Sequence, residues 1–204
     1  PEERARRGVV RRFQDARLFP SLSAYENILI ALERHIELRS ITLTALQVPQ
    51  ARAAERRVRR RADRLVEMLQ LGAYRDKFVK ELSTGLRRIT DIACVLATEP
   101  KLLLLDEPST GIAQAEAESL GPLIRRIAFE TGATMMVIEH DMPLISSIAD
   151  DLLAMDQGAV LVRGAPQTVL NDERVITSYL GSNEDVIGRT DGRRAPTKVG
   201  KKRG

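Results

Sequence analysis

The chain has 204 residues, 43% hydrophobic and 29% charged, which is typical of an ordinary globular protein that buries one sizeable core. The net charge is only +4 and aromatic residues make up 3%, so a stacking surface for nucleic acid is not expected. A single cysteine excludes an internal disulfide, and no apolar run approaches the ~20 residues that cross a bilayer, so we expect a cytosolic chain, free or docked on a membrane partner.

The first hundred residues are predicted to be mostly helical. Gln14 follows an extended run, VVRRFQ, and carries little information by itself. Ser23 and Glu26 in SAYE form a capping box ahead of the apolar run 28–32. A second helix is indicated by four apolar residues at helical spacing: Val58, Ala62, Leu65 and Leu69. We predict that it ends at Gly72, a residue type favoured just past helix ends, and that its arginine-rich face is solvated.

The stretch ELSTGLRR precedes apolar residues at helical spacing, which makes Ser83 a natural N-cap. Thr84 and Gly85 would then leave the first N–H groups of the helix uncovered. An uncovered helix start can bind an anion, because its N–H donors and the positive end of the helix dipole face the same way. A plain N-cap without a ligand is the alternative interpretation.

From about residue 100, short apolar runs alternate with helical patterns, as in strand-helix-strand units of a parallel sheet. The runs 102–105 and 133–138 predict strands covered on both faces. A crossover helix between them is indicated by Ala117, Leu120, Ile124, Ile127 and Ala128. We expect the pair 121–122, Gly-Pro, to weaken or bend it. The runs 152–155 and 159–162, on either side of DQG, predict a hairpin.

The predicted strand LLLL delivers Asp106 and Glu107 to the carboxyl edge of the sheet, where ligands of open α/β folds bind. One carboxylate could hold Mg²⁺ while its neighbour polarises a water for attack on a phosphate. An acidic pair at the end of a strand can also belong to an ordinary turn without a ligand. His140 follows the next strand, so it should leave the sheet at the same edge, placed to contact a γ-phosphate or a catalytic water. A lone histidine is also commonly structural.

Taken in order, three stretches resemble motifs of the ATP-binding subunits of ABC transporters: RRFQ, ELSTGLRRITDIACVLATEPKLLLLDEPSTGI and MMVIEHDM. They are similar to the Q-loop, to the signature motif with the Walker B strand and D-loop, and to the H-loop. The resemblance covers about residues 8–181. It implies an α/β fold, a truncated P-loop NTPase (ABC ATPase) core with a mostly parallel sheet plus a helical lobe.

The resemblance also implies a division of the chain. The expected parts are a Q-loop segment of the core (1–22), a helical subdomain with the signature helix (23–99), the core with Walker B, D-loop and H-loop (100–181), and a disordered basic tail (182–204).

ATP and Mg²⁺ are the cofactors that the resemblance implies. By likeness to the family, Asp106 would orient Mg²⁺ and Glu107 would act as general base. His140 would be the switch histidine, and Gln14 would touch Mg²⁺ and sense the membrane subunit. The implied activity is hydrolysis of ATP coupled to transport.

Ser83, Thr84 and Gly85 resemble the signature residues that grip the γ-phosphate of ATP bound to the opposite subunit of a head-to-tail dimer. The sequence departs from the family pattern at three positions. Thr84 stands where glycine is common, Leu86 where glutamine is common, and Ala113 where the D-loop usually ends in aspartate. These departures bear on coordination across the dimer rather than on family membership.

Two further stretches, GVVRRFQDARLFPSLSAYENILIAL and NDERVITSYLG, are most similar to subunits that energise import of branched-chain amino acids. A subunit of a lipopolysaccharide-type exporter is the alternative. The resemblance implies transmembrane permease subunits as partners, with a coupling helix received near Leu18, Phe19 and Pro20. It places the protein at the cytoplasmic face of the cell membrane as a peripheral subunit.

No G-x-x-x-x-G-K-[ST] pattern occurs in the 204 residues, so they lack the family's main phosphate cradle (Walker A), and the chain alone is predicted to be inactive. Two hypotheses follow. In one, the chain is part of a working ATPase whose phosphate loop lies upstream of Pro1. In the other, it is a non-catalytic subunit that docks on a transporter and completes a partner's ATP site. We favour the first, because Asp106, Glu107 and His140 have no obvious use in a chain that never binds ATP.

Overall fold

The computed structural model describes residues 3, 7–11, 18–33, 49–112 and 114–180, so Gln14, Ala113 and the tail after residue 180 lie outside the described residues. The chain divides into two compact units, Pro1–Ile148 and Ala149–Gly204. Among the described helices, none combines the length and apolar character needed to cross a bilayer.

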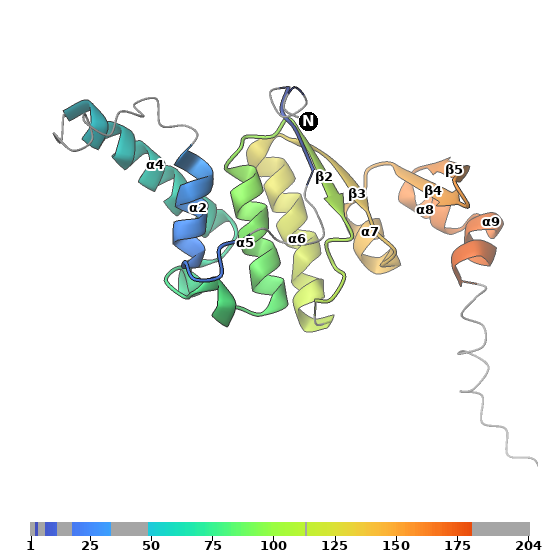
Figure 1. Cartoon of the computed structure of the whole chain (residues 1–204). Coiled ribbons are helices and arrows are strands. Elements are labelled where there is room, and N and C mark those ends of the chain that lie inside the picture. The colour runs from blue at the N-terminus through green and yellow to red at the C-terminus, as the bar shows by residue number, and fades with distance from the viewer. Residues whose placement is uncertain (1–2, 4–6, 12–17, 34–48, 113, 181–204) are drawn as a thin grey trace, which may run out of the picture. The chain divides into compact units, whose positions relative to one another are not determined.

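The first unit (Figure 1) holds, in chain order, β1 (Val9–Arg11), α2 (Ala24–Leu32), α4 (Pro49–Met68), the 3-10 turns η2 (Gly72–Tyr74) and η3 (Val79–Glu81), α5 (Thr84–Leu96), β2 (Leu102–Asp106), α6 (Gln114–Thr131), β3 (Thr134–Ile138) and α7 (Met142–Ile148). The second holds β4 (Leu152–Asp156), β5 (Ala159–Gly164), α8 (Pro166–Leu170), α9 (Glu173–Val175) and the π-helical turn η4 (Ile176–Leu180).

A three-stranded parallel sheet of order β1-β2-β3 forms the centre of the first unit. The register pairs Leu103 with Val10 on one side and with Met135 on the other. Because all three strands run the same way, their carboxyl ends meet at one edge. The α/β fold with a parallel sheet and helices, predicted from the sequence, is confirmed.

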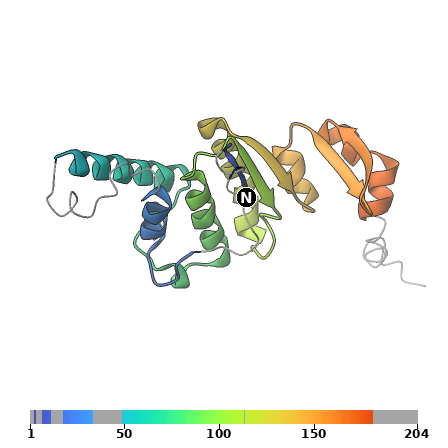
Figure 2. The same ribbon diagram turned by 45° about the horizontal axis from the view of Figure 1, so that its top comes forward.

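Helices cover one face of this sheet. Leu103 and Leu105 are fully buried in one core with apolar residues of α5 and α6, which lie side by side (Figure 1, Figure 2). On the opposite face, Met136 is 55% exposed and Ile138 is 53% exposed. The prediction that both strands are covered on two faces is therefore wrong for β3 within the described residues, because the described helices pack on the other side.

The predicted crossover helix is confirmed as α6, which continues through Gly121 and Pro122 without a break. Its apolar residues Leu120, Ile124 and Ile127 are buried in the core. A β-carbon on Gly121 would lie 2.9 Å from the Ser147 hydroxyl oxygen, so glycine here permits the close approach of α7.

The capping box at the start of α2 is also confirmed. The Ser23 hydroxyl accepts a hydrogen bond from the Glu26 N–H (3.1 Å), and the Glu26 carboxylate accepts one from the Ser23 N–H (2.7 Å). These bonds, the one from the Ser23 backbone first, lower the pKa of Glu26 below its ordinary value. Two otherwise unpaired donors of the helix start are thereby satisfied.

The end of α4 differs from the prediction. Gln70, not Gly72, takes the left-handed conformation that follows the helix, with φ 56°. The Leu71 N–H donates to the Val66 carbonyl (2.9 Å) and the Gln70 N–H to the Glu67 carbonyl (3.1 Å), which are the two bonds of a Schellman motif. Leu71 is fully buried, and its burial offsets the cost of a non-glycine residue in this conformation. The prediction at Gly72 was wrong because a buried leucine outweighed the local preference for glycine.

The second unit contains the predicted hairpin, formed by β4 and β5. Its two-residue loop, Gln157 and Gly158, has positive φ at both positions, 46° and 81°, as hairpin turns require. Ala154, Val169 and Val175 form a small core of their own between the hairpin and the helices α8 and α9.

Candidate functional site

The carboxyl edge of the parallel sheet brings together Asp106, Glu107 and His140. Asp106 is the last residue of β2 and is paired in register with Ile138, the last residue of β3. The Glu107 N–H donates to the Ile138 carbonyl (2.9 Å), which joins the two strand ends. His140 follows two residues later. The predicted convergence of these three residues at one edge is therefore found, whereas Gln14 lies outside the described residues.

The Asp106 carboxylate is partly buried, with 22% of the side chain exposed, and one of its oxygens accepts a hydrogen bond from the Arg11 guanidinium (2.8 Å). Arg11 ends β1, so all three strands contribute to this edge. No group of three or more His, Cys, Asp or Glu suited to a metal occurs within the described residues. A single carboxylate is compatible with Mg²⁺ that takes its other ligands from phosphates and water.

Glu107 has a constrained main chain. Its φ of 44° lies in the left-handed region, which a residue with a side chain rarely adopts. Arg88, on the second turn of α5, donates to the carbonyls of Glu107 (2.8 Å) and Pro108 (2.7 Å). The Glu107 carboxylate accepts from the Thr110 hydroxyl (2.9 Å). These bonds hold the carboxylate at the edge of the sheet with a defined orientation.

His140 presents an exposed imidazole, with 66% of the side chain accessible. The residue before it, Glu139, has a fully buried side chain, and its carboxylate lies 3.9 Å from the His140 Nδ1. One Glu139 oxygen accepts from the Ser109 N–H (2.7 Å), in the loop that follows Glu107. The loops after β2 and β3 are thus connected through side chains as well as through the main chain.

The sequence alone did not single out Arg11, Arg88 and Glu139. Each forms a hydrogen bond with a residue far away in the sequence, and no local sequence pattern predicts such a contact. The one available signal was at Glu139, an acid directly after a predicted strand, which is the pattern that pointed to Asp106.

Ser83 is confirmed as the N-cap of α5: its hydroxyl accepts from the Leu86 N–H (3.2 Å). Ser83 and Thr84 are exposed and Gly85 is buried. Because Arg88 contacts the loop after β2, the first turns of α5 lie at the same edge as Glu107. Ser83 stands five residues before Arg88, about 7.5 Å along the helix axis. The helix start is therefore near the three edge residues but not among them.

The segment before α2 is held by a buried asparagine. The Asn27 side chain accepts from the Phe19 N–H (2.8 Å) and donates to the carbonyls of Phe19 (3.2 Å) and Ser23 (2.9 Å). Asn27 is 3% exposed, while the Phe19 ring beside it is 54% exposed. A rigid segment thus presents an aromatic side chain to solvent at the place where the sequence predicts a partner helix.

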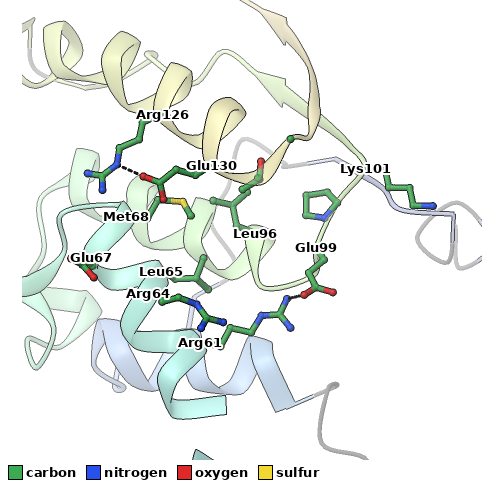
Figure 3. Close-up of a pocket in the computed structure, with 13 residues that line it drawn as sticks. Arg61, Arg64, Leu65, Glu67, Met68, Leu96, Glu99, Lys101, Arg126 and Glu130 are labelled. Carbon is green, nitrogen blue, oxygen red and sulfur yellow. Dashed lines mark hydrogen bonds and ion pairs between the residues drawn. The ribbon is translucent and has the colours of Figure 1, made fainter. Parts of the chain in front are cut away.

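A hollow of about 800 Å³ lies elsewhere, beside the ends of α4, α5 and α6 (Figure 3). Its lining is charged and includes two ion pairs: Arg126 contacts Glu130 (2.6 Å), and Arg61 pairs with Glu99. Lys101, which also lines it, precedes β2, so the hollow belongs to the amino edge of the sheet. The five residues of β2 span roughly 16 Å, so this hollow is separate from the carboxyl edge.

We expect the one thiol to be unreactive in the folded chain. Burial, with a smaller contribution from Asp91, raises the pKa of Cys94 to about 12. At about pH 8 the thiolate fraction should be roughly a thousandfold below that of an exposed cysteine. Alkylation by iodoacetamide, followed by mass spectrometry, should be slower by that factor than in the same chain unfolded with guanidinium. A native rate within tenfold of the unfolded rate would contradict the burial of this thiol.

Comparison with known proteins adds independent information. The protein family described as ABC transporter matches residues 1–110. The chain is 36% identical over 177 residues to the high-affinity branched-chain amino acid transport ATP-binding protein BraF of Pseudomonas aeruginosa, covering 87% of this chain and 69% of BraF. It is 35% identical over 178 residues to LivG of Escherichia coli, a protein described in the same words, with the same coverage of each chain. The lipopolysaccharide export system ATP-binding protein LptB of Haemophilus influenzae is 31% identical over 178 residues, or 87% of this chain and 67% of LptB.

Solved structures agree with these relatives. The ADP conformation of MJ1267, an ATP-binding cassette of an ABC transporter, matches with a TM-score of 0.67 and 25% identity, over 89% of this chain and 71% of that one. CbiO1 of Clostridium perfringens, part of the transporter complex cbiONQ, matches with the same score and identity over 90% and 68%. The resemblance that the sequence motifs suggested is confirmed, and the chain belongs to the ABC transporter family.

Proposed function

We propose that this chain is part of the ATP-hydrolysing subunit that energises branched-chain amino acid import, a peripheral subunit at the cytoplasmic face of the membrane. Its partners would be transmembrane permease subunits and a second ATP-binding subunit. The observation that carries the proposal is the hydrogen bond from the Glu107 N–H to the Ile138 carbonyl, which keeps Glu107 and the His140 loop together at one edge. The names of BraF and LivG support the substrate class.

In this proposal Glu107 is the general base. It would take a proton from the water that attacks the γ-phosphate, and the bonds from Arg88 and Thr110 keep its carboxylate oriented for that transfer. The exposed imidazole of His140 would donate a hydrogen bond to the γ-phosphate. Asp106, together with Gln14, would hold Mg²⁺, which when bound to ATP neutralises charge on the phosphates.

The exposed start of α5 would serve a second nucleotide. Ser83, Thr84 and Gly85 would grip the γ-phosphate of ATP bound to the opposite subunit of a head-to-tail dimer, because N–H donors and the positive helix end favour an anion there. Residues 23–99 would act as the helical lobe that receives the permease, with Phe19 beside its entry point.

Transport by the assembled complex tests the proposal. In the assembled transporter this chain is joined to a phosphate loop of the G-x-x-x-x-G-K-[ST] type. Proteoliposomes that contain this transporter should take up leucine, isoleucine and valine when ATP is supplied on the side of this subunit, and should not take up lysine. Similarity to LptB favours lipopolysaccharide export as a second candidate. Active ATP hydrolysis without uptake of any of the three amino acids would remove the import proposal in favour of the exporter.

The 204 residues alone are expected to hydrolyse ATP no faster than a sample without protein. They contain no G-x-x-x-x-G-K-[ST] sequence, whose N–H groups and lysine hold the β- and γ-phosphates, so the edge residues would have no positioned substrate. Phosphate release from the purified chain with ATP and Mg²⁺ measures this, with the same chain carrying Glu107→Gln as control. Turnover that the Glu107→Gln substitution abolishes would show that the chain needs no such loop.

A further inference from the structure

We propose that Glu139 is a positioning residue that fixes Glu107 and His140 relative to each other. The inference rests on the function proposed above and concerns the same edge of the sheet. Glu139 itself would not touch the nucleotide, because its side chain is fully buried. Its carboxylate would act through the main chain of the two loops that carry the reacting groups.

The Glu139 carboxylate is held mainly by N–H donors of the main chain. One oxygen accepts from the Ser109 N–H (2.7 Å), and the other from the N–H groups of His140 (3.1 Å) and Asp141 (3.4 Å). The Nδ1 atom of the His140 imidazole lies 3.9 Å from the same carboxylate. A buried carboxylate is costly unless its oxygens are hydrogen-bonded, so these three donors account for its presence.

These contacts restrain the two loops that carry Glu107 and His140. Ser109 lies two residues after Glu107, and the Glu107 carbonyl is held from the other side by Arg88 (2.8 Å). The main chain at Glu107 is left-handed, which costs free energy and persists when the surroundings hold it in place. The bond from Ser109 to Glu139 is part of that restraint. The bond from the His140 N–H to the same carboxylate extends the restraint to the second loop.

A purely local role does not explain the arrangement. The start of α7 is capped by Asp141, whose carboxylate accepts from the Leu144 N–H (2.9 Å), so the helix does not need Glu139 as its cap. The shortest bond of Glu139 goes to Ser109, thirty residues earlier in the chain. A side chain that served its own loop alone would not make that contact.

Glutamine is the informative substitution. The amide has the shape of the carboxylate but carries an acceptor on one side and two N–H donors on the other. In either orientation the NH₂ group faces at least one of the three main-chain N–H donors, so Glu139→Gln must release Ser109 or the pair His140 and Asp141. Glu139→Ala releases all three and should have the larger effect.

In the assembled transporter, Glu139→Gln should lower kcat for ATP hydrolysis roughly ten- to a hundredfold while KM for ATP stays within about threefold, because misplaced catalytic groups affect the reacting step more than binding. The matched control is Glu130→Gln, which alters a carboxylate paired with Arg126 at the amino edge of the sheet. It should stay within twofold of wild type in both constants. A Glu139→Gln protein that folds and keeps the wild-type kcat would overturn the proposal.

Amide hydrogen exchange provides a readout that needs no activity. In the wild-type protein the Ser109, His140 and Asp141 amides should be protected, and Glu139→Gln should raise exchange at Ser109 or at the other two at least tenfold. Exchange at Ser109 as fast as in an open loop would overturn the proposal even if no variant folds. If the wild-type transporter does not hydrolyse ATP, the proposed function is refuted. The exchange measurement then still tests whether Glu139 holds the two loops.

Discussion

The Glu107→Gln variant of the assembled transporter should bind ATP with wild-type affinity and hydrolyse it roughly 10²- to 10⁴-fold more slowly. The amide oxygen can still accept from the Thr110 hydroxyl, so the side chain keeps its position. What it loses is the ability to take a proton from the attacking water, and that interaction exists only in the transition state. ATP binding, measured with a fluorescent ATP analogue, should therefore be unchanged. Turnover, measured by phosphate release, should fall.

Glu67→Gln is the control, because Glu67 is an exposed carboxylate on α4 that belongs to no part of the proposed site. Its turnover should lie within twofold of wild type. If Glu107→Gln kept more than a tenth of the wild-type rate, Glu107 could not be the general base, and proton transfer would have to be assigned to another group at this edge.

Asn27→Ala should be the most destabilising single polar substitution in the helical part, lowering the free energy of unfolding by about 3 kcal/mol. The asparagine accepts from the Phe19 N–H and donates to the carbonyls of Phe19 and Ser23, at a site that is 3% exposed. Alanine leaves the Phe19 N–H without a partner, and a buried unpaired donor costs its full desolvation penalty. The carbonyls of Phe19 and Ser23 each lose one of their two hydrogen bonds and keep the one from a main-chain N–H. Urea unfolding followed by far-UV circular dichroism measures the change.

The matched control is Asn171→Ala, since Asn171 is exposed and its side chain donates to the Gln167 carbonyl (2.8 Å). It should cost less than about 0.5 kcal/mol. Equal losses for the two variants would show that the Asn27 bonds do not hold the segment. If Asn27→Ala destabilises as expected, the assembled transporter should also couple ATP hydrolysis to uptake less tightly, because Phe19 loses its anchor.

Local signals in the sequence were sufficient for much of the fold. The capping box at Ser23 needs two residues three positions apart, and the strand that ends in Asp106 and Glu107 needs only a buried apolar run followed by acids. Parallel topology then requires the carboxyl ends to meet, so the approach of His140 to Glu107 follows from chain order. Each of these features depends on a pattern shorter than ten residues or on topology.

Features that depend on distant contacts could not be predicted. Gln70 takes the conformation expected of Gly72 because Leu71 is buried in a core that the local sequence does not reveal. Arg11 pairs with Asp106 across ninety-five positions, and Glu139 reaches Ser109 across thirty. Such pairs are fixed by the folded sheet, so they become visible only when the strands are placed side by side.

The most direct test is a structure of the assembled transporter with Glu107→Gln, determined with ATP and Mg²⁺ bound. We expect the γ-phosphate to lie against residue 107 and the His140 imidazole, with Mg²⁺ beside Asp106 and with Ser83 facing the nucleotide of the second subunit. ATP bound anywhere else, for example in the charged hollow lined by Arg61 and Lys101, would contradict the assignment of the carboxyl edge as the site of hydrolysis.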